Sequence, residues 1–234
     1  MAHIVIIGGS SGIGAAVAEL ATEKHWRVTM ASRNKEKARQ FASRLSDAVT
    51  AYSVDISQPE SIEQLFRHCD EVDYLVVSAA ELSYGAFATQ PFDAMRTMID
   101  TKLWGYIYTL RYAIPRLTTS ASVVLLSGLA AWKPGNTAAI VGAVNGAIVS
   151  LGKALAVELA PVRVNVVAPG ITDTPSWDHL DSGERAQFFN AVRQTLPVRR
   201  IAKAREIGEG ILFALQNPFV TGTVLHMDGG ALLV

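Results

Sequence analysis

Ile7-Gly8-Gly9-Ser10-Ser11-Gly12-Ile13-Gly14 is the stretch that decides the fold of this chain. The apolar run at residues 4–7 is typical of a buried strand, and the alanine-rich segment from Ala15 is typical of a helix. Glycine lets a backbone approach a ligand closely, and the first N–H groups of a helix attract an anion. A strand, a glycine turn and a helix in this order predict a site for the pyrophosphate of a dinucleotide. The expected contacts are Gly8, Ser10, Ser11, Gly12, Ile13 and Gly14.

The bulk composition limits the function. The chain has 234 residues, of which half are apolar, and its 21 basic residues balance 21 acidic ones. This length suits one large domain over residues 1–234, and the charge balance argues against nucleic acid or an anionic membrane as a partner. Cys69 is the single cysteine, and we expect neither a signal peptide nor a metal site. A cytoplasmic protein fits these features.

Short apolar runs alternate with helical patterns along the whole chain. Strands are expected at 3–7, 27–31, 49–54, 74–78, 122–127, 163–168 and 223–226. Helices are expected at 12–25, 35–46, 59–69, 91–117, 138–159, 183–195 and 204–216. Such alternation predicts a doubly wound, three-layer α/β/α sheet of Rossmann type, in which the apolar stretch 138–160 is a buried helix and not a membrane span.

Residues 173–197 break this alternation. The segment contains Trp177, His179, Phe188 and Phe189. In doubly wound folds, loops that follow the carboxyl ends of strands form the ligand site, so we interpret this segment as a substrate lid. A surface helix pair is the alternative.

The second strand ends with a signature for the cofactor. An acidic residue at this place binds the 2′-hydroxyl of NAD, whereas Ser32 and Arg33 suit a 2′-phosphate, so we expect NADP(H). A solvated arginine at the start of a helix is the alternative. Further contacts are expected at the same sheet edge, at Asp55, Ile56, Ser78, Ala79, Ala80, Pro169, Gly170, Ile171 and Thr174.

These pieces together resemble the short-chain dehydrogenase/reductase family over essentially the full length. The resemblance rests on the spacing of Gly8, Gly12 and Gly14, on Asp55-Ile56, on residues 165–170 and on the ending at residues 220–230. It implies a seven-stranded parallel sheet in the order 3-2-1-4-5-6-7. It also implies that the Ile171 backbone holds the nicotinamide carboxamide and that Thr174 bonds the cofactor.

The family's catalytic residues are replaced. The resemblance implies a Ser–Tyr–Lys triad with a helper Asn, but it aligns Gly128 with the serine, Val141 with the tyrosine, Asn145 with the lysine and Lys102 with the Asn. No tyrosine occurs between Ala113 and Val234. Valine has no proton to give, so the usual acid step cannot run through position 141.

Four polar residues remain as candidates for the chemistry: Ser127, Lys102, Glu81 and Asn145. Glu81 follows the fourth strand and is a possible acid, as is Asp173. Lys102 can place an ammonium near the nicotinamide ribose, Asn145 can bind that ribose, and Ser127 can orient a polar substrate atom. Each also has an ordinary alternative, namely a solvated or packed side chain.

The expected function is an NADP(H)-dependent oxidoreductase of atypical mechanism that acts on a small organic carbonyl, imine or conjugated substrate. Two alternatives stay open: a non-redox isomerase or cyclase that keeps NADP as a structural group, and a cofactor-binding pseudoenzyme that regulates a partner. The helix at 138–160 carries Ala and Gly on all sides, and together with the long helix at 91–117 it resembles the family's four-helix dimer interface. We therefore expect a homodimer or homotetramer.

Overall fold

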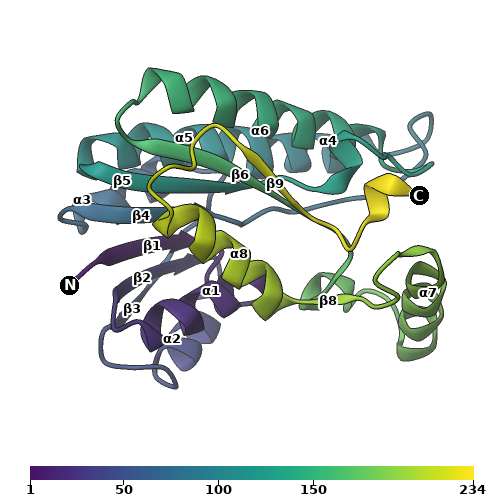
Figure 1. Cartoon of the computed structure of the whole chain (residues 1–234), viewed down its shortest axis with the longest axis horizontal. Coiled ribbons are helices and arrows are strands. Elements are labelled where there is room, and N and C mark those ends of the chain that lie inside the picture. The colour runs from purple at the N-terminus through teal and green to yellow at the C-terminus, as the bar shows by residue number, and fades with distance from the viewer.

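A seven-stranded parallel sheet runs through the computed structural model, which describes residues 1–234 (Figure 1). Its strands are β1 (His3–Ile7), β2 (Arg27–Ser32), β3 (Val49–Ser53), β4 (Val72–Val77), β5 (Leu117–Leu126), β6 (Arg163–Pro169) and β9 (Val224–Met227). Their order is β3-β2-β1-β4-β5-β6-β9, and every neighbouring pair is parallel. The expected order 3-2-1-4-5-6-7 is confirmed, with β9 as the seventh strand.

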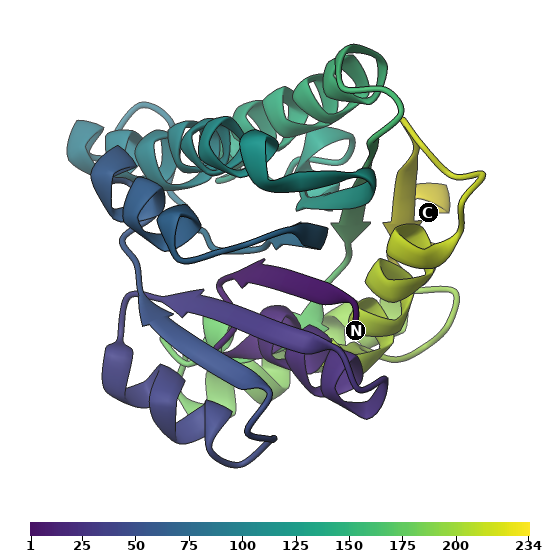
Figure 2. The same ribbon diagram turned by 90° about the vertical axis from the view of Figure 1, so that its left-hand side faces the viewer.

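Helices cover both faces of this sheet (Figures 1 and 2). One face packs on α1 (Gly12–Glu23), α2 (Lys35–Ala42) and α8 (Ala204–Gln216), and the other packs on α3 (Pro59–Arg67), α5 (Gly105–Ala113) and α6 (Ala139–Glu158). The side chains between the layers are apolar and almost completely buried, as parallel strands covered on both faces require. The doubly wound, three-layer class is therefore confirmed.

The long helix expected at 91–117 is interrupted. It consists of α4 (Phe92–Met98), a π-helical segment η1 (Ile99–Trp104), α5 and the short η2 (Ile114–Arg116), and β5 already begins at Leu117. A π-turn spreads its backbone hydrogen bonds over one more residue than an α-turn, which rotates the side chains that follow. Here Thr101 and Lys102 are both buried. The interruption therefore places a polar side chain and a cation inside the fold.

Helix α6 is buried on one face only. By length and composition it is apolar enough to cross a membrane, but in this fold it packs against β6 and a short 3-10 turn, η3 (Leu129–Ala131). On its outer side Val157 is 80% exposed. The helix expected to be buried is therefore only partly buried within a single chain.

The segment expected to form the lid has its own small base. Two-residue strands β7 (Thr172–Asp173) and β8 (Ala202–Lys203) pair in parallel and flank it. Between them lie η4 (Pro175–Trp177) and α7 (Ser182–Thr195), and α7 stands at the margin of the molecule in Figure 1. Asp181 caps α7 by accepting hydrogen bonds from the N–H groups of Gly183 and Glu184.

Candidate functional site

The glycine loop after β1 has the backbone that a phosphate site requires. Gly8 has φ of +95° and Gly12 has φ of +55°, which is the left-handed region that favours glycine. A Cβ at Gly14 would overlap the carbonyl oxygen of Gly8, so α1 starts in direct contact with the end of β1. Ser11 is the N-cap residue and makes no side-chain capping bond. The first N–H groups of α1 are therefore open to an anion.

Three other strand ends meet this loop. The Ser78 hydroxyl after β4 donates to the Ile7 carbonyl at 2.9 Å, and the Ser10 hydroxyl donates to the hydroxyl of Ser32, the last residue of β2, at 2.7 Å. Thr174, after β6, lies 3.3 Å from where a Cβ at Gly12 would stand. Ser32, Ser78 and Thr174 thus surround the loop, as expected for the carboxyl edge of the sheet.

Other residues expected on the cofactor side have structural contacts of their own. The Asp55 carboxylate accepts bonds from the Ser57 N–H at 2.9 Å and the Ser57 hydroxyl at 2.7 Å. Ile56 is buried and packs against Gly105. Gly170 lies so close to Asp228 that a Cβ there would stand 2.8 Å from the Asp228 Cα.

The remaining four expected contacts at this edge are small or half-buried. Pro169 is the last residue of β6, and Ile171 lies between it and β7. The Ala79 N–H donates to the Ile7 carbonyl at 3.0 Å, and Ala80 follows it without a bulky side chain. The path along the sheet edge is therefore lined by small groups, which leaves room beside the backbone.

Arg33 and Glu81 form an ion pair across this edge. Arg33 Nη1 donates to Glu81 Oε2 at 2.6 Å, and the two side chains are 63% and 48% exposed. The Glu81 N–H in turn donates to the Thr101 hydroxyl at 3.2 Å. The carboxylate expected as a catalytic acid is therefore bound to the arginine expected for the 2′-phosphate.

Lys102 is a buried cation without an acidic partner. Its side chain comes from η1 and is 4% exposed, and its Nζ donates to the Ser127 carbonyl at 3.2 Å. Burial disfavours the charged form and lowers the pKa of Lys102 to about 8. The amine therefore changes protonation close to neutral pH, where a proton donor is most effective.

Ser127 and Asn145 complete a small polar cluster with Lys102. The Ser127 hydroxyl donates to the Asn145 backbone carbonyl at 3.0 Å, and both residues are buried. The Asn145 amide nitrogen lies 2.9 Å from where a Cβ at Gly128 would stand, so the absence of a side chain at Gly128 makes room for it. The Asn145 Oδ1 is buried and has no hydrogen-bond partner. It is an acceptor that a ligand hydroxyl can satisfy.

Val141, aligned with the family's tyrosine, is 2% exposed and packs with Met98 and Ala138.

The structure brings together three of the four candidate catalytic residues, Lys102, Ser127 and Asn145. Glu81 makes no hydrogen bond to any of them and points to Arg33 instead. Sequence reasoning missed the close fit of Asn145 against Gly128, although the glycine at the position aligned with the family's serine was a signal for it.

Arg185 ties parts of the expected lid segment to one another. Its guanidinium donates to Asp173 at 2.6 Å and to Asp178 at 2.8 Å, and it lies 5.5 Å from the centre of the Phe189 ring. The Trp177 indole donates to the Thr172 carbonyl at 3.0 Å. Asp173, a possible acid in the sequence, is therefore an ion-pair partner of Arg185.

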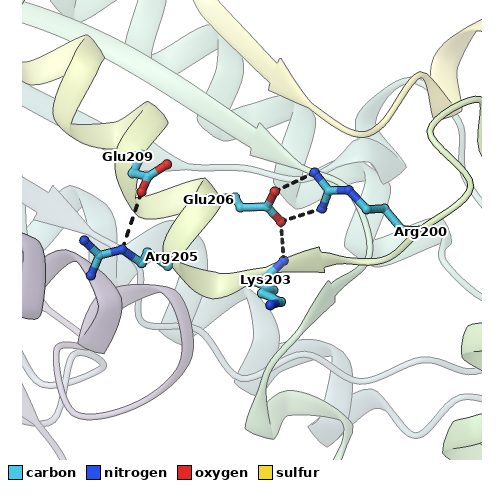
Figure 3. A pocket seen from close by; sticks show the side chains of 5 residues that line it. All are labelled: Arg200, Lys203, Arg205, Glu206 and Glu209. Carbon is cyan, nitrogen blue, oxygen red and sulfur yellow. Dashed lines mark hydrogen bonds and ion pairs between the residues drawn. The ribbon is translucent and has the colours of Figure 1, made fainter.

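A surface hollow on α8 belongs to a different part of the molecule (Figure 3). Its five lining side chains are all charged: Arg200, Lys203, Arg205, Glu206 and Glu209. Arg200 holds both oxygens of Glu206, and Arg205 pairs with Glu209 and Glu23. Four of the five lining side chains are therefore engaged in ion pairs, and the Lys203 ammonium is the one that makes none.

The fold and the glycine loop at the carboxyl edge of the sheet define a Rossmann-type α/β protein. Comparisons with known proteins identify its family. The family model described as enoyl-(acyl carrier protein) reductase matches residues 8–231. The 3-oxoacyl-[acyl-carrier-protein] reductase of Homo sapiens is 30% identical over 237 residues, which cover 98% of this chain and 97% of that protein. The chain belongs to the short-chain dehydrogenase/reductase family.

Two solved structures superpose closely on this chain. A small-chain dehydrogenase in complex with NADPH is 32% identical with a TM-score of 0.89, and the match covers 100% of this chain and 99% of that one. The MalC reductase/Diels-Alderase from Malbranchea aurantiaca is 25% identical with a TM-score of 0.92, over 100% of this chain and 97% of that one. Both alignments therefore span the glycine loop, the polar cluster and the lid segment.

Proposed function

We propose that this chain is an NADP(H)-dependent oxidoreductase that reduces a small organic carbonyl, imine or conjugated substrate, with Lys102 as the proton donor. The observation that carries the proposal is the buried Lys102 amine, held by the Ser127 carbonyl. A buried ammonium without a carboxylate partner is costly to the fold, and Ser127 follows β5 at the sheet edge that carries the glycine loop, so a catalytic role is favoured.

The residues present fit the cofactor. The open glycine loop suits the pyrophosphate, and Arg33 suits the 2′-phosphate. The unpartnered Asn145 Oδ1 suits a ribose hydroxyl as donor. The relative solved with NADPH supports this assignment. When bound, NADPH supplies the hydride that reduces the substrate carbon.

Lys102 then supplies the proton. As the carbonyl oxygen gains negative charge, the ammonium stabilises it and transfers a proton to it, which leaves a neutral amine that solvent reprotonates. The Ser127 carbonyl fixes the position of Nζ during this step. In this account Val141 forms an apolar wall where the family's tyrosine would stand.

The charge of Lys102 also favours one kind of substrate. An ammonium in a buried site attracts a group that becomes anionic and repels one that is already cationic. A neutral carbonyl, conjugated carbonyl or neutral imine is therefore favoured over an iminium.

The direct test mixes the protein and NADPH with a panel of ketones, enones and cyclic imines and follows the loss of reduced-cofactor absorbance. We expect oxidation with at least one neutral acceptor. Tight NADPH binding without oxidation by any acceptor would argue against an oxidoreductase.

Two observations favour a second candidate. The likeness to a reductase/Diels-Alderase and the apolar wall at Val141 suit a cyclase that keeps NADP as a structural group. Such an enzyme would convert a polyunsaturated substrate without any change in reduced-cofactor absorbance, and that outcome distinguishes it from the reductase.

We also propose that the chain assembles as a homodimer or homotetramer through helices 91–117 and 138–160. The outer side of α6 exposes Val157, and a Cβ at Gly146 would meet nothing within 4 Å, so a second helix can approach closely. Trp104, at the end of η1, is 46% exposed and stacks on Tyr108, which lies one turn further along in α5. Light scattering at micromolar concentration should give two or four times the chain mass of 25.1 kDa. A monomer would refute this assembly.

A further inference from the structure

The Arg33–Glu81 ion pair occupies the place where the 2′-phosphate of the cofactor is expected. Arg33 directly follows β2, and its backbone is held by the Ser53 hydroxyl, which donates to the Arg33 carbonyl at 3.3 Å. Glu81 reaches it from the loop after β4, where the Glu81 N–H is held by Thr101. Both ends of the pair are thus fixed by backbone contacts.

This pairing changes what the arginine offers to a ligand. A free guanidinium attracts a phosphate dianion strongly. The Arg33 guanidinium is already bonded at 2.6 Å to the Glu81 carboxylate, and the pair as a whole has no net charge. A 2′-phosphate must displace Glu81 and then lie near its negative charge. A dinucleotide without the 2′-phosphate leaves the pair intact.

We propose that Glu81 is a specificity-determining residue that competes with the 2′-phosphate for Arg33 and thereby lowers the preference for NADP(H) over NAD(H). This inference rests on the proposed binding of NADP(H). It gives Glu81 a role at the adenosine end of the site instead of in proton transfer.

The test compares dissociation constants for NADPH and NADH, measured by cofactor fluorescence, in the wild type and in Glu81→Gln. Removing the carboxylate should tighten NADPH binding by about three- to tenfold and change NADH binding by less than about twofold, as expected for an exposed ion pair and a removed repulsion. The effect should shrink at high salt, because both side chains are exposed to solvent.

Two further variants separate this effect from a general change in charge. Glu36→Gln removes an exposed acid of α2 that bonds Gln40 and not Arg33, and it should leave the NADPH-to-NADH ratio unchanged. In an Arg33→Met background, Glu81→Gln should no longer tighten NADPH binding.

The outcomes are distinct. An unchanged ratio in Glu81→Gln, with both cofactors bound by the wild type, would overturn the role of Glu81 and leave the proposed function intact. Weaker NADH binding in that variant would overturn it as well, since Glu81 would then hold the ribose hydroxyls. If the wild type binds neither cofactor, both the inference and the proposed function fail.

Discussion

Replacing Lys102 with methionine should slow NADPH-dependent reduction by about 100- to 10,000-fold, the usual contribution of a general acid, while NADPH affinity stays within about threefold of wild type. Methionine has a similar length and fills the buried space, but it has no proton to give. The measurement is a single-turnover rate with the best acceptor of the panel. A rate within about threefold of wild type would exclude Lys102 as the donor.

The free energy of unfolding of Lys102→Met is the control for this experiment, because it shows whether the variant is still folded. Because burial lowers the pKa of Lys102 to about 8 from 10.5, the fold is destabilised at neutral pH by the need to bury this charge. Lys102→Met should therefore raise the free energy of unfolding at pH 7, by at most about 3 kcal/mol. The advantage should diminish between pH 8 and 10.5, where the unfolded lysine also loses its proton. A stable but inactive variant separates loss of chemistry from loss of fold.

Replacing Gly14 with alanine should weaken NADPH binding by more than about 100-fold. The new Cβ would overlap the Gly8 carbonyl and lie 2.8 Å from the Ser78 hydroxyl, so the glycine loop must move away from β4. The first N–H groups of α1 then no longer point at the pyrophosphate. Isothermal titration with NADPH measures the change.

Gly135→Ala is the matched control for this substitution. Gly135 lies in an exposed loop, and a Cβ there meets nothing within 4 Å. It should bind NADPH as the wild type does. Equal affinity in Gly14→Ala and Gly135→Ala would mean that the glycine loop does not hold the phosphates.

The sheet was predictable because its signals are local. The run at residues 4–7 and the glycine turn after it require a strand and a helix start in contact, and the same alternation recurs along the chain. The π-helical segment Ile99–Trp104 was not predictable, since the stretch from 91 to 117 has the periodicity of one continuous helix. The wider π-turn points Lys102 into the fold, and nothing in the amino-acid composition of residues 99–104 indicates that such a turn forms there.

The sequence predicted which residues form the site better than it predicted their contacts with one another. Lys102, Ser127 and Asn145 were expected as candidates, and the fold brings them into one cluster. Glu81 was expected among them, but its partner Arg33 follows a different strand, and only the sheet order places the two at the same edge. Contacts between distant segments depend on this order, which local patterns do not contain.

The pH dependence of the reduction rate tests the role of Lys102 most directly. An acid must carry its proton before it can give it, so the single-turnover rate of the wild type should be constant at low pH and fall above a pKa of about 8. The residual rate of Lys102→Met should lack this fall. A wild-type rate that stays constant to pH 9.5 (roughly 1.5 units above that pKa), or the same fall in both proteins, would contradict the assignment of Lys102 as the proton donor.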